Sequence, residues 1–297
     1  MGDFNIIHIF IKNKVMKWLF EEHSSNSLFT IRKNDYDFKG DGILKSTTIN
    51  TIAYNLNEAQ TVIIDEVGYT FPKNTVLPLM ANQHFIFERP EDIIAWQFNR
   101  DFYCIVNHDA EVGCVGFLFY GIDIPLFLHL TSFEMQNIIS IEKMCLEDMQ
   151  IKDRMQGEML RTLLKRLIIN TTRIARTQTP AYHDLPDDKM DMVRKFNLLI
   201  EGNFRTEHEV QFYASALNKS PKTLSNIFLL FKLPPPSKLI QNRIVLEAKR
   251  YLQYTDKTAK EITYMLGFGS PAHFSRFFKQ HTGVSITQFR ETGLIKP

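Results

Sequence analysis

The chain has 297 residues, of which 44% are hydrophobic and 23% charged, and its formal net charge at pH 7 is +2. This length suggests two domains, and the ordinary apolar content excludes a chain too polar to build packed cores. No apolar run approaches the roughly 20 residues that span a membrane, and the N-terminus lacks the basic-then-apolar layout of a secretion signal. The sequence therefore predicts a soluble, cytoplasmic protein with no membrane partner.

The small net charge hides an uneven distribution along the chain. From Lys195 to the C-terminus there are 15 Lys and Arg residues against 7 Asp and Glu residues, a net charge of +8. The preceding residues carry 20 basic and 26 acidic side chains, a net charge of −6. Because contact with nucleic-acid phosphates needs an excess of Lys and Arg, the C-terminal third is the candidate for such contact.

Side chains with metal-binding or catalytic potential form no known motif. The cysteines are odd in number and not closely paired, which argues against a disulfide framework or zinc ribbon and fits a reducing compartment: Cys104, Cys114 and Cys145. Three histidines lie singly rather than in a close pair, so no metal or other cofactor is expected: His84, His108 and His129. Without a phosphate loop, nucleophile elbow or His-Glu-x-x-His run, no catalytic residue is assigned and an enzyme is not expected.

The N-terminal part carries a strand pattern. Val15 to Glu22 has helical spacing, but from Leu28 to about Leu130 short runs rich in Ile, Val, Phe and Thr alternate with turn-forming residues. The runs are Thr48–Tyr54, Gln60–Glu66, Gln83–Glu88, Ile93–Asn99, Tyr103–Asn107 and Val115–Tyr120. They predict a β-sandwich or small barrel, with a ligand-holding jelly roll as the natural candidate.

From Thr131 to Thr177 the apolar period becomes helical. Two amphipathic helices are expected, with a break near Ile151–Asp153 or at Gly157. A polar, Pro-bearing and acidic linker follows at residues 178–188, and a helix from about Lys189 to Ile200 leads out of it.

The C-terminal part contains one short pattern twice. Ser220-Pro221 and Ser270-Pro271 each place an N-cap Ser before a Pro at the first helical position, so each should begin a helix. Apolar residues at i, i+3 and i+4 mark the buried side of both helices: Leu224, Ile227 and Phe228, then Phe274, Phe277 and Phe278. Helices 221–231 and 271–281 are predicted.

A second short helix precedes each copy. Thr206–Glu209 and Thr258–Glu261 both read as capping boxes, and Gly267 should end the later helix in a left-handed conformation. The result is two helix-turn-helix units. Between them Ser237 to Tyr254 reads as one amphipathic helix about 27 Å long at 1.5 Å per residue, close to the ~34 Å between successive major-groove faces of DNA.

This C-terminal pattern resembles the DNA-binding domain of the AraC/XylS family of bacterial transcription regulators. The resemblance spans about a hundred residues, and two features depart from the family pattern: Leu233-Pro-Pro-Pro236 replaces a Gly-containing turn, and Asn226 replaces a longer basic side chain. The matching residues are Val210, Tyr213-Ala214, Leu217-Asn218, Ser220-Pro221, Leu224-Ser225, Phe228, Arg243, Glu247-Ala-Lys-Arg250, Leu252, Glu261-Ile262, Leu266-Gly-Phe268, Phe274-Ser-Arg-Phe-Phe-Lys279, Thr282-Gly-Val284 and Phe289-Arg290.

The resemblance implies an α+β organisation in four parts. Residues 1–130 are expected to form a cupin-like β domain that senses a ligand or merely dimerises, and residues 131–177 a helical dimerisation segment. Residues 178–188 are the linker, and residues 189–297 an all-α domain of seven helices that carries both helix-turn-helix units.

The second helix of each unit supplies the candidate DNA contacts. Outward-facing side chains are expected to touch base edges in the major groove: Lys222, Ser225, Asn226, Ala272, Ser275 and Arg276. Four lysines are expected to bind phosphates: Lys219, Lys232, Lys249 and Lys279. Phosphate contact or a salt bridge for Arg276, and a solvated surface charge for the lysines, are the alternatives.

The expected function is that of a sequence-specific transcription regulator bound to double-stranded DNA. A homodimer, RNA polymerase contact and a small-molecule effector are further expectations, and activation and repression both stay open. One alternative is a ligand-binding or dimerisation protein whose helix-turn-helix part mainly contacts RNA polymerase or another protein. Another is a cupin-type metalloenzyme fused to a DNA-binding module.

Overall fold

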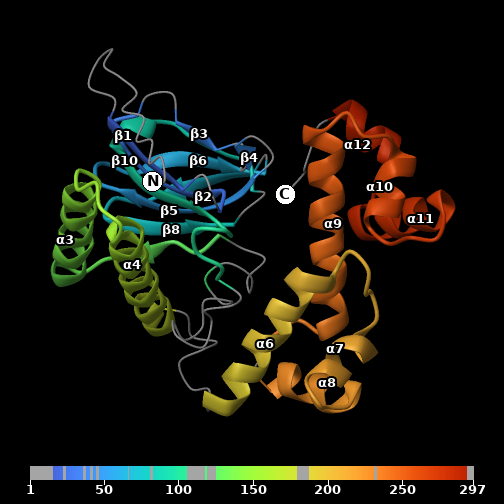
Figure 1. The fold of residues 1–297 in the computed structure, drawn as a ribbon. Helices are drawn as coiled ribbons and strands as arrows, with labels where there is room; N and C mark the ends of the chain where they lie inside the picture. The colour runs from blue at the N-terminus through green and yellow to red at the C-terminus, as the bar shows by residue number, and fades with distance from the viewer. Residues whose placement is uncertain are drawn as a thin grey trace. The chain divides into compact units, whose positions relative to one another are not determined.

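Two compact units, residues 1–179 and 180–297, make up the computed structural model. It describes residues 16–22, 25–35, 38–40, 43–44, 47–65, 67–80, 83–105, 118, 125–178, 187–230 and 233–292. Antiparallel sheets occupy the first unit together with two helices, and the second unit is helical (Figure 1). The predicted α+β class is therefore confirmed, whereas the finer bounds at residues 130, 177 and 188 stay predictions.

Two sheets form the β part of unit 1. The larger sheet has the order β1-β2-β10-β5-β8-β11, with β4 paired to β5, and the smaller has the order β3-β9-β6-β7. Each described strand pair is antiparallel. The bounds are β1 Met16–Glu22, β2 Ser27–Lys33, β3 Lys39–Gly40, β4 Ile43–Leu44, β5 Thr47–Asn55, β6 Gln60–Ile64, β7 Val67–Phe71, β8 Thr75–Leu79, β9 Phe85–Phe87, β10 Ile93–Asn99 and β11 Leu128–His129; a 3-10 turn, η1, covers Pro90–Asp92.

The two sheets share one apolar core. Side chains from β5, β8 and β10 of the larger sheet meet side chains from β6, β7 and β9 of the smaller sheet. Burial in β6 alternates along the strand, so one side of that sheet faces this core and the other faces solvent. The buried members are Phe38, Ala53, Val62, Ile64, Phe71, Leu77, Leu79, Phe85, Phe87, Ile93 and Ala95.

Three expectations for the N-terminal part are wrong. Met16–Glu22 is a strand rather than a helix, because it pairs along its whole length with β2, and this pairing outweighs its helical spacing. Tyr103 to Ile105 is a buried loop and not a strand. Leu118, the one described residue of the run 115–120, is helical; the rest of that run lies outside the described residues.

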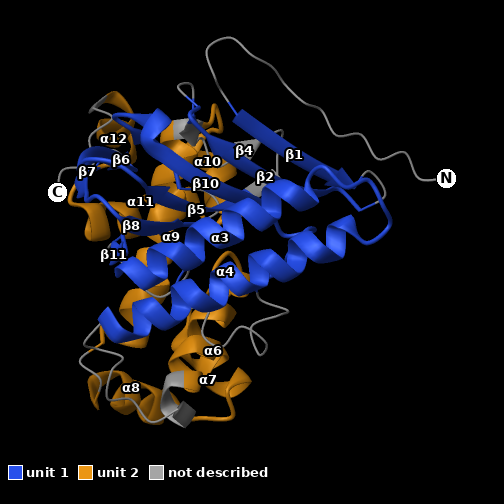
Figure 2. Ribbon diagram, turned by 90° about the vertical axis from the view of Figure 1, so that its left-hand side faces the viewer, with its two compact units in different colours: residues 1–179 blue, residues 180–297 orange. Residues whose placement is uncertain are grey.

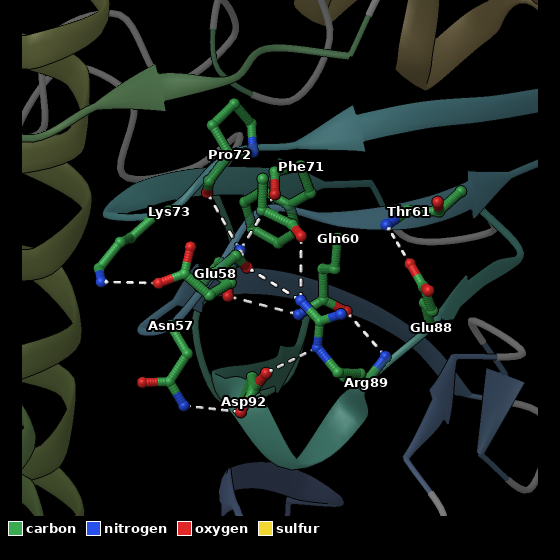
Figure 3. Close-up of polar contacts among 12 residues, drawn as sticks. Asn57, Glu58, Gln60, Thr61, Phe71, Pro72, Lys73, Glu88, Arg89 and Asp92 are labelled. Carbon is green, nitrogen blue, oxygen red and sulfur yellow. Dashed lines mark hydrogen bonds and ion pairs between the residues drawn. The ribbon is translucent and has the colours of Figure 1, made fainter.

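Asn55, at the end of β5, organises the turns at one end of the sheets. Its side chain is fully buried, and its amide nitrogen donates to the carbonyl oxygens of Glu58, Phe71 and Pro72 at 3.1, 3.0 and 3.1 Å. Gln60 donates to its side-chain oxygen at 3.3 Å. Figure 3 shows the surrounding polar contacts, in which Arg89 joins these turns to η1. The Asn55 bonds therefore join the β5–β6 turn and the β7–β8 turn to the end of β5.

Helices α3 (Ser132–Asp148) and α4 (Gln156–Gln178) lie side by side on unit 1 (Figure 2). Both helices are fixed to the strands by ion pairs, α3 through Glu142 with Lys33 at 2.8 Å and α4 through Arg161 with Glu22 at 3.1 Å. The predicted pair of helices is confirmed, with its break at residues 149–155. None of the described helices is long and apolar enough to cross a membrane.

The described part of unit 2 contains seven helices, as predicted. They are α6 Asp187–Asn203, α7 Val210–Ala216, α8 Pro221–Leu230, α9 Pro236–Tyr254, α10 Ala259–Met265, α11 Pro271–Thr282 and α12 Ile286–Thr292. A single core that includes Phe196, Tyr213, Phe228, Ile244 and Phe278 joins all of them.

Replacement of Asn55 by Ala should destabilise unit 1 by about 1–3 kcal/mol, because it removes the hydrogen bonds of a fully buried amide to two turns. Asn57→Ala is the matched control, since Asn57 is exposed and its amide donates to the Asp92 carboxylate at 2.6 Å. Urea unfolding of the full chain measures both variants. Equal, small losses for the two would show that the Asn55 bonds add no stability.

Candidate nucleic-acid interface

Helices α7 and α8 form the first helix-turn-helix unit. The turn between them contains Asn218, which adopts a left-handed conformation at φ 54°. Ser220 is the cap of α8, with its hydroxyl oxygen accepting from the Thr223 N–H at 3.1 Å, and Pro221 follows it as the first helical residue. These local features match the sequence prediction.

The predicted capping box at Thr206–Glu209 does not form. Glu209 occupies the N-cap of α7 without a side-chain cap bond, and the Thr206 hydroxyl donates to the Asn203 carbonyl at 3.3 Å instead. A competing side-chain bond accounts for the difference: the Tyr213 hydroxyl donates to the Glu207 carbonyl at 2.6 Å and holds this segment as a loop. The capping-box pattern does not report this donor, which lies on α7 itself.

Helices α10 and α11 form the second unit and follow their local signals closely. Thr258 and Glu261 form the predicted reciprocal capping box at the start of α10. Gly267 adopts φ 73° in the turn, and the Ser270 hydroxyl caps α11 by accepting from the His273 N–H at 3.3 Å. Gly283, at φ 78°, ends α11.

The side of α8 and α11 opposite the buried stripe is open to solvent. Leu224 and Phe228 of α8, and Phe274 and Phe278 of α11, are buried in the core. All the predicted base-contacting side chains are exposed: Lys222, Ser225, Asn226, Ala272, Ser275 and Arg276. The Arg276 guanidinium lies along its own helix, where its Nε donates to the Ala272 carbonyl at 3.4 Å.

The predicted phosphate-binding lysines are less uniform. Lys219 and Lys279 are exposed, and Lys249 is half-buried on α9. Lys232 lies outside the described residues. Two leucines that no sequence signal had singled out, Leu229 and Leu230 at the end of α8, are 76% and 61% exposed.

Helix α9 connects the two units. Its buried residues Ile240, Ile244, Ala248 and Leu252 belong to the core that both units share. At 1.5 Å per residue, its 19 residues extend about 28 Å. This length is close to the roughly 34 Å between successive major-groove faces on one side of DNA.

A cluster of buried charges on α9 was not foreseen from the sequence. Glu247 pairs with Arg205 at 2.7 Å and with Arg243 at 2.9 Å, and Arg250 lies 3.9 Å from it. Arg243 also pairs with Glu201 of α6 at 2.7 Å. We refer to these five residues as the Glu247 cluster. Arg243 lies four residues before Glu247 and Arg250 three residues after it on one helix, and these spacings were the available signal in the sequence.

The Glu247 cluster keeps its charges despite burial. Burial alone would raise the pKa of Glu247, but Arg243, Arg205 and Arg250 outweigh it and lower the pKa to about 2. Burial would lower the pKa of Arg243, and the carboxylates of Glu201 and Glu247 raise it instead. The cluster is therefore an ionised network that joins α6, the segment after it and α9.

The histidines and cysteines offer no metal site in the part of the chain that is described. No group of three or more His, Cys, Asp or Glu side chains there could hold a metal ion. Cys104 and Cys145 are buried, and burial raises the pKa of the Cys145 thiol to about 12. His108 and Cys114 lie outside the described residues.

Comparison with known proteins points to the same region. Residues 213–292 match the family described as "Helix-turn-helix domain". A curated relative, "Probable transcription factor PqrA" from Proteus vulgaris, is 39% identical over 70 residues. That alignment covers 24% of this chain and 57% of the relative's length.

Three solved structures are similar to this chain. ToxT from Vibrio cholerae strain SCE256, with an unsaturated fatty acid bound, has a TM-score of 0.39 and 18% identity, over 84% of this chain and 89% of that chain. The C-terminal domain of the response regulator yesN from Fusobacterium nucleatum has a TM-score of 0.31 and 22% identity, over 32% and 93%. The AraC-like activator CuxR has a TM-score of 0.28 and 8% identity, over 83% and 86%.

Replacement of Glu247 by Gln should lower the stability of unit 2 by about 3–5 kcal/mol, because Arg243 and Arg205 lose their buried counter-charge. Thermal unfolding of the full chain, followed by far-UV circular dichroism, measures the change. Glu261→Gln is the control, since its carboxylate is exposed. A loss for Glu247→Gln no larger than for the control would contradict the role of the cluster.

The same cluster predicts an acid dependence. The pKa of Glu247 is lower in the folded chain than its ordinary value of 4.5, so its contribution to stability is complete above about pH 4.5 and declines as the pH falls toward 2. The difference in Tm between the unmodified chain and Glu247→Gln should therefore shrink over that range. A difference that stays constant from pH 5 to pH 2.5 would contradict this assignment.

Proposed function

We propose, from the premise that the C-terminal unit carries an AraC-type helix-turn-helix domain, that this chain is a sequence-specific, DNA-binding transcription regulator. Helices α8 and α11 read the major groove. The observation that carries the proposal is that both helices have the same cap and buried stripe and expose their polar faces, while one helix, α9, connects them. The excess of basic residues in this part of the chain supplies the attraction to DNA.

Base recognition is assigned to the exposed faces of the two helices. Arg276 donates two hydrogen bonds to O6 and N7 of a guanine, once its guanidinium leaves the Ala272 carbonyl. Asn226 pairs with the N6 and N7 edge of an adenine, and Ala272 contacts a thymine methyl group. Ser225, Ser275 and Lys222, exposed on the same faces, complete the set.

Lysines outside these faces are assigned to the phosphates. Lys219 begins the segment that enters α8, and Lys279 lies in the last turn of α11. Together with Lys249 and Lys232 they position the domain on the duplex without reading its sequence.

Unit 1 is proposed to set the oligomeric state and to respond to a small molecule. Residues 1–130 would form the cupin-like sensor domain and residues 131–177 the dimerisation segment, followed by the linker 178–188 and the DNA-binding domain 189–297. Apolar side chains exposed on and between α3 and α4 support a homodimer through this segment: Phe133, Ile139, Ile151, Met155 and Met159. The protein would act in the cytoplasm, without catalytic activity of its own.

A second candidate function has one observation in its favour. Leu229 and Leu230 expose a large apolar surface at the end of α8, and such a surface suits a protein partner better than a phosphate backbone. The helix-turn-helix part would then mainly contact RNA polymerase or another protein. Binding of the full chain to duplexes selected from a random pool decides between the two, since enrichment of one sequence supports the DNA-reading function and its absence supports the alternative.

Replacement of Arg276 by Ala should cost about 1–3 kcal/mol on the selected duplex and relax the preference at one base pair. Lys279→Ala is the matched comparison from the same helix, and it should weaken binding to selected and random duplexes alike. Fluorescence anisotropy at fixed salt measures the affinities of the unmodified chain and of both variants for both duplexes. Equal losses on selected and random DNA for Arg276→Ala would contradict its base-reading role.

A further inference from the structure

The segment between α6 and α7 lies directly against the turn of the second helix-turn-helix unit. We call residues 204–209 the α6–α7 loop. A Cβ atom added at Gly267 would lie 2.2 Å from the carbonyl oxygen of Arg205 and 3.3 Å from the Cα of Thr206. Since real Cβ atoms do not approach backbone that closely, Gly267 is required for this contact as well as for its positive φ of 73°.

Side chains extend this contact between the α6–α7 loop and the second helix-turn-helix unit. The His208 ring packs on Phe268 with centroids 4.8 Å apart. Phe268 is buried and packs in turn on Phe274 and Phe277 of α11, at 5.2 and 5.1 Å. The α6–α7 loop therefore contacts the buried side of α11 through a single side chain, the ring of Phe268.

The same loop is also bound to the first helix-turn-helix unit and to α9. The Tyr213 hydroxyl of α7 donates to the Glu207 carbonyl, as described above. The Arg205 guanidinium pairs with Glu247 and lies 4.5 Å from the centroid of the Phe204 ring. The Arg243 guanidinium lies 4.0 Å from the same centroid. A short loop therefore contacts α7, α9 and the α10–α11 turn at once.

From these contacts we infer that the α6–α7 loop locks the two helix-turn-helix units together, with Arg205 as its positioning residue. Helix α9 is one connection between the units, and the loop is a second. Two connections prevent the second unit from swinging about α9, so the separation of α8 and α11 is fixed before DNA binds. This lock also sets the spacing that is accepted between the two sequence elements of a DNA site, a consequence that rests on the proposed DNA-reading function.

The contact can be broken at one residue with a close control. Gly267→Ala drives a methyl group into the Arg205 carbonyl, which must move away. Gly283→Ala imposes similar backbone strain, because Gly283 has φ 78°. Among the described residues, however, no atom other than those of its chain neighbours lies within 4 Å of its added Cβ. His208→Ala removes the ring contact with Phe268 without backbone strain and serves if Gly267→Ala does not fold.

The lock itself is tested without DNA. Spin labels are placed through Leu229→Cys on α8 and Gln280→Cys on α11, both exposed, in a full chain whose native cysteines are replaced by Ala. Pulsed electron–electron double resonance then measures the distance distribution between the labels. A broader distribution for Gly267→Ala and His208→Ala than for Gly283→Ala supports the lock, and equal widths for all variants overturn it.

The consequence for DNA is measured with the duplex selected by the unmodified chain, after insertion of one, two or three base pairs between its two elements. We expect the unmodified chain and Gly283→Ala to discriminate against the insertions, and Gly267→Ala and His208→Ala to lose roughly tenfold of that discrimination. Unchanged discrimination in folded variants overturns the role in spacing. A third outcome combines broadened label distances in Gly267→Ala and His208→Ala with no sequence preference in the unmodified chain. This outcome would overturn the DNA-reading function and leave the lock in place.

Discussion

The buried carboxylate of Glu247 is the constraint on which the helical unit depends. A carboxylate on the buried side of α9 is costly unless cations meet it, and Arg243, Arg205 and Arg250 do so. Arg243 also pairs with Glu201 on α6, so the need to neutralise one charge joins α6, the α6–α7 loop and α9. The frame that presents α8 and α11 is therefore set by electrostatics as well as by the apolar core.

Helices α8 and α11, which are proposed to read the DNA, each have one buried side and one exposed side. The aromatic and aliphatic stripe of each helix enters the shared core, which leaves Asn226 and Arg276 on the solvent side. Burial of the stripe fixes the rotation of a helix about its own axis, and α9 with the loop contact fixes its position. The side chains proposed to read bases need no rearrangement of the backbone to become available.

What the sequence could predict was the local structure of unit 2. The caps at Ser220 and Ser270, the box at Thr258 and the left-handed Gly267 depend on neighbours within three or four residues, and each prediction is confirmed. The exposure of the six proposed base-contacting side chains followed from the helical period alone. Their roles on DNA stay predictions.

The failures have a different cause, since each involves a contact that the local apolar period or capping pattern does not report. Thr206 does not cap α7 because the Tyr213 hydroxyl holds the Glu207 carbonyl, and Met16–Glu22 is a strand because β2 supplies its hydrogen bonds. The pairs Arg243–Glu201 and Arg205–Glu247 each span 42 residues. No period or local motif reports such contacts, so the Glu247 cluster and the contact of the loop with Gly267 became visible only in three dimensions.

Hydroxyl-radical footprinting of the full chain on its selected duplex tests the central claim most directly. Two helices fixed about one turn of DNA apart should protect two short segments on one face of the duplex, separated by roughly 10 base pairs. Both protected segments should persist when random duplex is added in excess. A single protected segment, or protection that random duplex abolishes, would contradict the account of two readers held in one rigid frame.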